Sequence, residues 1–155
     1  MRIGHGFDVH AFAAGRRLVL GGVDVPHDKG LAGHSDADVL IHAIIDALLG
    51  AAALGDIGAM FPPSDERYRD ADSLNLLVEA YSRVREGDLR LVNVDATIVA
   101  EEPRLSDYVG TMRERIAAST GVGAGQVSVK ATTSDGLGFA GAGAGIAAFA
   151  VVLLE

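Results

Sequence analysis

Two side chains near the start of the chain have the spacing of metal ligands. Residues 2–10 (RIGHGFDVH) are predicted to form a strand with two distinct faces, and Asp8 and His10 lie two positions apart on one of them. A carboxylate and an imidazole that project from the same side of a rigid strand are a natural pair of ligands for zinc. A third ligand would complete a catalytic site with an open position.

His42 is the candidate third ligand, and it lies in a long apolar segment. Residues 33–53 are predicted to form one buried helix, because apolar side chains surround it except along one stripe. Asp38, His42 and Asp46 form that stripe, since they recur every four residues. Burying a polar group without a partner costs on the order of 2 to 7 kcal/mol. The stripe is therefore expected to face a metal, a charge or a polar cavity, although a lone histidine in such a helix is more often a core residue.

The start of this helix is a candidate anion site. Ser35 followed by Asp38 fits a capping box, which places His34 and Ser35 at the end of the helix where backbone N–H groups are unpaired.

Two loops carry further candidates. Residues 55–65 (GDIGAMFPPSD) mix acidic and apolar groups, which fits either a ligand wall or a loop held over the core by Phe61. Residues 132–136 (TTSDG) offer hydroxyls and the carboxylate of Asp135. Such a loop can bind phosphate oxygens together with a hard cation, or it can be an ordinary turn.

The remaining elements must position these groups. The helix at 73–85 is expected to be capped by Ser73 and to bury Leu74, Leu77, Val78, Tyr81 and Val84. The other expected elements are a hairpin at 17–26 turned at Gly21 and Gly22, strands at 89–100, 126–132 and 146–154, and a helix at 106–119. This order predicts a single α+β domain spanning residues 1–155, a two-layer sandwich in which helices cover one face of a mixed sheet.

Composition limits the classes of function. The hydrophobic fraction is 49% over 155 residues, which is high for a monomer and indicates that part of the apolar surface is buried between subunits. The net charge of −8 disfavours nucleic acid. No membrane span or leader is predicted, so a cytoplasmic location is expected. The chain has no cysteine, so any metal must bind to histidine and carboxylate.

Several motifs together resemble one enzyme family. They are RIGHGFDVHAF, GHSDADVLIHAIIDALLGAAALGDIG with FPPSD after it, NVDATIVA and VKATTSDGLGF. In these stretches, which follow one another along nearly the whole chain, the protein resembles the 2-C-methyl-D-erythritol 2,4-cyclodiphosphate synthases of non-mevalonate isoprenoid biosynthesis. The resemblance implies a homotrimeric lyase with an active site at each subunit interface. Its substrate would be 4-diphosphocytidyl-2-C-methyl-D-erythritol 2-phosphate, which is cyclised with release of CMP.

The resemblance also implies roles for individual residues. It implies one Zn²⁺ per subunit at Asp8, His10 and His42, and a second divalent ion, Mg²⁺ or Mn²⁺, at Asp135. His34 and Thr133 would stabilise the transition state. The implied substrate-binding residues are Asp8, His10, His34, Ser35, Asp56, Ile57, Gly58, Phe61, Pro62, Pro63, Ser64, Asp65, Ala100, Glu101, Glu102, Pro103, Arg104, Leu105, Ser106, Thr132, Thr133, Ser134, Asp135 and Phe139. Residues 100–106 would form the cytidine pocket.

The chain departs from the family pattern at four positions. Asp135 stands where the family has glutamate, Gly136 replaces lysine, and Ala142 and Ala144 replace an arginine and an acid. An active enzyme is still expected, with weak binding of geranyl or farnesyl diphosphate in the threefold channel. Two alternatives remain open: a non-catalytic trimer that binds zinc and a nucleotide, and a zinc phosphohydrolase, which the absence of a dedicated base for water disfavours.

Overall fold

A five-stranded mixed sheet forms the frame of the computed structural model, which describes residues 1–155. Strands β5 (Leu91–Val99) and β6 (Val127–Thr132) run parallel, and the other neighbouring strands run antiparallel. A separate hairpin of β2 (Leu18–Leu20) and β3 (Val23–Val25) turns at the expected glycines. In order across the sheet, the strands are β4 (Lys29–Leu31), β1 (Arg2–Ala14), β7 (Gly145–Leu154), β5 (Leu91–Val99) and β6 (Val127–Thr132).

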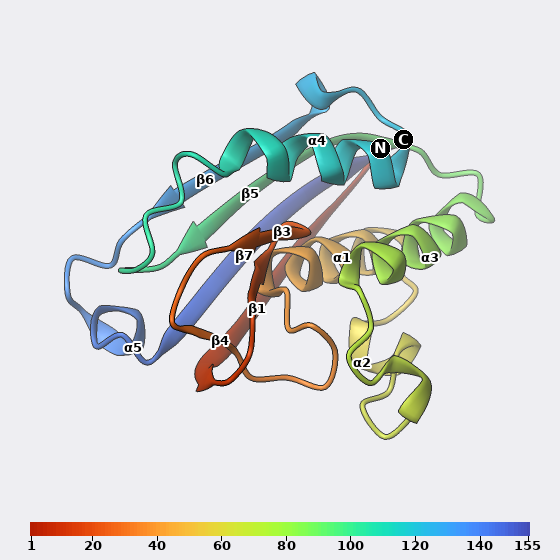
Figure 1. The fold of residues 1–155 in the computed structure, drawn as a ribbon. Coiled ribbons are helices and arrows are strands. Elements are labelled where there is room, and N and C mark those ends of the chain that lie inside the picture. The colour runs from red at the N-terminus through yellow and green to blue at the C-terminus, as the bar shows by residue number, and fades with distance from the viewer.

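Three long helices lie on one face of this sheet (Figure 1). They are α1 (Val39–Ala52), α3 (Ser73–Arg85) and α4 (Val109–Thr120). The predicted α+β fold with a mixed sheet is therefore confirmed. None of the helices is long and apolar enough to cross a membrane. The shorter helices are α2 (Ile57–Met60), η1 (Glu66–Tyr68), η2 (Ala124–Gln126) and α5 (Gly138–Gly141).

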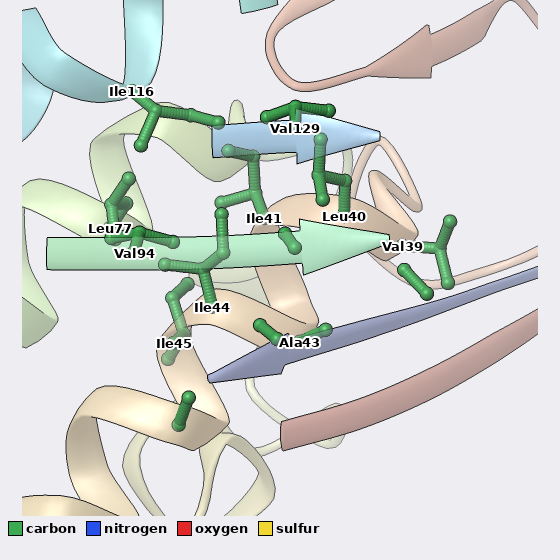
Figure 2. Packing of buried hydrophobic residues seen from close by; sticks show 14 of the residues in the cluster. Val39, Leu40, Ile41, Ala43, Ile44, Ile45, Leu77, Val94, Ile116 and Val129 are labelled. Atoms are coloured by element: carbon green, nitrogen blue, oxygen red, sulfur yellow. The ribbon is translucent and has the colours of Figure 1, made fainter. Parts of the chain in front are cut away.

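Helix α1 lies at the centre of the hydrophobic core. Its apolar side chains meet residues from α3, α4, β5 and β6 (Figure 2). Full burial of one such side chain contributes about 1.5 to 3 kcal/mol, so this helix accounts for much of the stability of the fold. The residues that Figure 2 labels are Val39, Leu40, Ile41, Ala43, Ile44, Ile45, Leu77, Val94, Ile116 and Val129.

Two glycines of β1 set the distance between α1 and the sheet. Gly4 and Gly6 lie on the face of β1 that points toward α1, and both are buried. A Cβ atom on Gly6 would lie 1.9 Å from the backbone oxygen of Ala43, and one on Gly4 would lie 1.9 Å from that of Ala47. Only glycine permits this close approach. The strand and the helix that carry the candidate ligands are therefore packed backbone against backbone.

The opposite face of the sheet is partly apolar and is not covered by the chain. Ile3 is 74% exposed, Phe7 45% and Phe149 41%. Phe7 and Phe149 are register partners on β1 and β7, and their ring centroids lie 4.9 Å apart. Thr97 is in turn the register partner of Phe149 on β5, so polar groups border the apolar ones. We refer to this surface, formed by Ile3, Phe7, Val9, Phe149 and Val151, as the open sheet face.

The predicted start of the central helix was wrong. Helix α1 begins at Val39 and not at residue 33, and its N-cap is Asp38, whose side chain accepts a hydrogen bond from the Ile41 backbone N–H. The predicted capping box starting at Ser35 does not form. Asp38 also accepts hydrogen bonds from the backbone of Gly21 and Gly22, which a local pattern cannot reveal.

Other boundaries also differ. Asp72 caps α3 in place of Ser73, and the buried stripe of that helix includes Leu76 and Ala80, whereas Val78 is 48% exposed. The third long helix starts at Val109, three residues later than predicted. The loop at 55–65 contains the short helix α2. On β5, a register shift between Leu91 and Asn93 leaves Val92 only partly buried.

Candidate metal centre and substrate pockets

The three predicted zinc ligands meet in the structure. Asp8 Oδ2 lies 2.8 Å from His10 Nε2 and 3.0 Å from His42 Nδ1, and the two ring nitrogens are 3.2 Å apart. The ligand atoms of all three residues lie within 4.8 Å of one another. Donor atoms around a tetrahedral zinc ion lie about 3.4 Å from each other. The triad therefore fits a zinc ion with little rearrangement.

The electrostatics of the triad also suit a cation. Burial raises the pKa of Asp8, but hydrogen bonds from His10 and His42 outweigh this effect and hold the pKa of the carboxyl below its usual range. The carboxylate is thus ionised. His10 Nδ1 lies 2.5 Å from the carbonyl oxygen of Ala32, which can only accept, so Nδ1 carries a proton, and Nε2, which donates to Asp8 here, is the atom that would bind a cation once its proton is lost.

The other members of the polar stripe on α1 have separate partners. Asp38 is fully buried and accepts the three backbone hydrogen bonds described above. Asp46 accepts a hydrogen bond of 2.8 Å from the Ile57 backbone N–H and so ties α2 to α1. Of the three stripe residues, only His42 belongs to the triad. The stripe therefore connects α1 to three separate parts of the structure: the β2–β3 turn, α2 and the triad.

A small cavity of about 220 Å³ opens beside the triad. His34 lies in its wall, with Nε2 3.1 Å from the carbonyl oxygen of Asp65. Ser35 is buried there, and its hydroxyl lies 3.1 Å from His42 Nε2. Both the ligand-wall interpretation and the core interpretation of the loop at 55–65 capture part of its role, since Phe61 is buried and lines this cavity. The lining residues are Asp8, His10, His34, Ser35, His42, Ile57, Gly58, Phe61, Pro63, Tyr68 and Leu76.

A larger cavity of about 580 Å³ lies between the start of α4 and the ends of β5 and β6. Most of the predicted cytidine segment contributes to its wall, but Glu102 lines a different hollow beside Ala142. The lining residues are Ala100, Glu101, Pro103, Arg104, Leu105, Ser106, Val109, Val129, Lys130, Ala131, Thr132 and Thr133.

Glu101 organises the hydroxyl-rich loop next to this cavity. Its Oε1 atom accepts hydrogen bonds from Ser134 N at 2.9 Å, Ser134 Oγ at 3.0 Å and Gly136 N at 3.2 Å. These hydrogen bonds, led by those from the Ser134 and Gly136 backbones, lower the pKa of Glu101. The loop that carries Thr133 and Asp135 is thereby fixed to the end of β5.

Some predicted site residues line neither cavity. Asp56 caps α2, and Asp65 caps η1 and pairs with Arg67. The others are Pro62, Ser64, Glu102, Ser134, Asp135 and Phe139. Their roles stay predictions.

Sequence reasoning missed several residues that the fold brings to the site. Tyr68 and Leu76 line the small cavity, and Lys130 and Ala131 line the large one. Lys130 lies two residues before Thr132 on β6, and Leu76 belongs to the buried stripe of α3, both within elements whose bounds were predicted closely.

The sheet places both cavities at the same end of the molecule. His10 on β1 is the register partner of Ile146, Ala147 pairs with Val99, and Val99 pairs with Thr132. Three strand spacings separate His10 from Thr132, or about 14 Å. One chain thus carries a candidate metal centre and a larger pocket at the same end of the sheet.

The chain matches known proteins over its whole length. The model of the YgbB family covers residues 1–155. The 2-C-methyl-D-erythritol 2,4-cyclodiphosphate synthase of Moorella thermoacetica is 66% identical over 154 residues, which are 99% of this chain and 94% of that protein.

Solved structures agree with this match. The bifunctional IspDF of Campylobacter jejuni superposes with a TM-score of 0.95 at 43% identity, over 99% of this chain and 42% of that longer chain. A 2C-methyl-D-erythritol-2,4-cyclodiphosphate synthase in its CDP-bound form gives 0.91 at 34% identity, over 99% and 100% of the two chains. With its metal triad and pockets in place, this chain belongs to the YgbB family, the family of the 2-C-methyl-D-erythritol 2,4-cyclodiphosphate synthases.

Proposed function

We propose that the protein converts 4-diphosphocytidyl-2-C-methyl-D-erythritol 2-phosphate into 2-C-methyl-D-erythritol 2,4-cyclodiphosphate and CMP. The observation that carries the proposal is the convergence of Asp8, His10 and His42 at a cavity that lies beside a larger pocket. The triad of one subunit would hold the phosphate end of the substrate, and the pocket at residues 100–106 of a neighbouring subunit would hold the cytidine. The relative solved in its CDP-bound form supports a cytidine nucleotide as the ligand class.

The reaction needs no nucleophile from the protein. An oxygen of the substrate's own 2-phosphate attacks the β-phosphorus, the new P–O bond closes the ring, and the bond from that phosphorus to the CMP oxygen breaks. The protein has to align these groups and neutralise their charge. The chain has no cysteine, and the two serine hydroxyls beside His42 Nε2, those of Ser35 and Ser73, are buried, which is consistent with this chemistry.

The chain's own residues would hold two cations. Asp8, His10 and His42 would hold Zn²⁺, and Asp135 would hold Mg²⁺ or Mn²⁺. Bound there, the ions supply Lewis-acid polarisation of the phosphoryl oxygens.

Two side chains would act on the phosphates directly. The Thr133 hydroxyl, exposed at the edge of the large cavity, donates to Asp135 Oδ1 at 3.3 Å, and it would turn from this partner to donate to a phosphoryl oxygen. The His34 ring, whose Nε2 donates to the Asp65 carbonyl oxygen, would do the same from the small cavity through a protonated Nδ1.

We further infer that the protein acts as a homotrimer. The open sheet face supports this, because exposed phenylalanine side chains at its centre are unusual for a monomer. Assembly would let the metal centre of one subunit complement the large pocket of another, as the family resemblance implies.

One incubation separates this function from its alternatives. The purified protein is mixed with the cytidine substrate, Zn²⁺ and Mg²⁺, and the products are separated by chromatography and identified by ³¹P NMR. CMP together with the cyclic diphosphate is expected. CMP with a linear product would indicate a phosphohydrolase. Binding without any CMP would indicate a non-catalytic zinc- and nucleotide-binding protein.

A further inference from the structure

The imidazole of His42 has an outer edge that the metal triad does not use. Its Nδ1 atom faces Asp8 and His10, whereas Nε2 lies 3.0 Å from Ser73 Oγ and 3.1 Å from Ser35 Oγ. A hydroxyl can either donate or accept, so these two contacts alone do not decide which ring nitrogen carries the proton. The contacts on the far side of Ser73 do decide it.

Ser73 is bound to a carboxylate through two hydrogen bonds. Asp36 Oδ1 accepts from the Ser73 hydroxyl at 2.5 Å, and Asp36 Oδ2 accepts from the Ser73 backbone N–H at 2.9 Å. An ionised carboxylate has no proton to give. The hydroxyl proton of Ser73 therefore points to Asp36, and only its lone pairs remain for Nε2 of His42.

The position of Asp36 is fixed by the backbone around it. Its own N–H donates to the carbonyl oxygen of Ala71 at 3.0 Å, and its Oδ1 accepts from the Asp38 N–H at 3.1 Å. Ser73 is fully buried. The carboxylate, the hydroxyl and the imidazole thus form one chain of hydrogen bonds between the segment before α1 and the start of α3, with little access for competing water.

We propose that Asp36 and Ser73 are positioning residues that keep the proton of His42 on Nε2 and its Nδ1 lone pair toward the metal site. A ring nitrogen binds a metal only through an unprotonated lone pair, and the partner of the other nitrogen sets the tautomer and the ring orientation. This inference rests on the proposed function, since it serves the same metal centre. Ser35 is a second acceptor, but its hydroxyl has no carboxylate to fix its direction.

Zinc affinity is the first measurement. Ser73→Ala removes the acceptor that Asp36 orients, and we expect the zinc dissociation constant, measured by competition with a chromophoric chelator, to rise about 10- to 100-fold. Ser82→Ala is the matched control, because Ser82 lies exposed on the same helix and contacts neither residue. Circular dichroism of both variants establishes that they are folded.

The second measurement observes the proton itself. In NMR spectra of zinc-loaded protein labelled with ¹⁵N-histidine, the signal of the His42 Nε2 proton should be shifted downfield and should exchange slowly with solvent. The signal is assigned by its absence from the spectrum of His42→Ala. Ser73→Ala should move this signal upfield and speed its exchange, whereas Ser82→Ala should leave it in place. A purely structural role for Ser73 would change stability without changing this signal.

Asp36→Asn tests the same role while keeping the Ser73 hydroxyl. It therefore also serves if Ser73→Ala does not fold. The amide that replaces the carboxylate can donate to Ser73 Oγ, which frees the hydroxyl proton to turn toward Nε2. Zinc binding should again weaken about 10- to 100-fold. If both variants keep the parent's affinity and proton signal while His42→Ala loses zinc, the positioning role is wrong and the metal centre stands. If the parent protein itself binds no zinc, both proposals are wrong.

Discussion

His42 is the single residue that tests the metal centre most directly. Most of the core contacts of α1 are made by other side chains, and alanine is favoured in helices, so His42→Ala is expected to fold and to lose zinc. Elemental analysis of the purified protein measures this. His5→Ala, on the opposite face of β1, is the control and should retain one zinc per chain. One zinc per chain in His42→Ala would contradict the ligand assignment.

Asp135 is the residue on which the second ion depends. Its backbone is left-handed, with φ of 52°, a conformation that asparagine tolerates better than alanine. Asp135→Asn therefore removes the charge with the least disturbance of the loop. We expect it to keep zinc and to lose Mg²⁺-dependent turnover by at least about tenfold. Activity that follows the parent's curve across a Mg²⁺ titration would show that Asp135 has no such role.

The sequence predicted the candidate metal ligands but not the residues that hold His42 in position. Asp8, His10 and His42 follow from periodicities of two and four, which are properties of single elements. Asp36 and Ser73 are far apart in the chain and carry no such pattern. Their contact exists because the segment before α1 packs against the start of α3, so it could not be read from either segment alone.

Among the elements, the close packing of β1 on α1 makes the sharpest prediction. Gly6→Ala would place a methyl group 1.9 Å from the Ala43 oxygen, so the helix must move away from the strand and carry His42 with it. A loss of at least about 3 kcal/mol in unfolding free energy is expected, together with weaker zinc binding. Urea denaturation and a zinc titration measure the two effects.

Gly50→Ala is the control for that substitution. Gly50 lies in α1 with open space around it, so alanine should raise stability by about 0.5 to 1 kcal/mol through helix propensity. Equal effects of the two substitutions would mean that the helix can shift on the sheet at little cost.

The cap of α1 should make stability depend on pH. Burial, and secondarily the charge of Asp36, raises the pKa of Asp38 to about 6 despite the backbone N–H groups that favour its charged form. A raised folded-state pKa stabilises the fold at low pH. This contribution, at most about 3 kcal/mol, is lost as the pH rises from about 4 through about 6.

The measurement compares the metal-free parent with Asp38→Asn by urea unfolding from pH 4 to pH 7. The asparagine does not titrate, so the parent's stability relative to the variant should decrease over this range. A parent-to-variant difference that stays constant with pH would rule out the shift.

Element types were largely predictable, and element ends were not. Strong periodicity identified β1, α1 and α3, but α1 begins six residues later than predicted because Asp38 binds the β2–β3 turn as well as Ile41. In α3, Ala80 completes the buried stripe in place of Val78, since a small residue fits where the helices pack closely. Such choices depend on neighbours that a single segment does not contain.

For the whole molecule, the open sheet face predicts assembly. Sedimentation should give a mass three times the 16.0 kDa of one chain. Phe149→Asp places a charge at the centre of this face and should dissociate the assembly at micromolar concentration. Val78→Asp, an equally exposed position on α3, is the control and should not. Monomeric parent protein would rule out the homotrimer.

The two ends of the chain lie together at the edge of the molecule remote from the metal centre (Figure 1). Arg2 and Leu154 are register partners, and His10 lies about 26 Å further along the strand. A linker of a few glycines and serines could therefore close the chain into a ring, and new ends could be opened at the exposed Gly125. For the same reason another protein can be tethered at either end without obstructing the pockets, which makes the fold a suitable module for gene fusion.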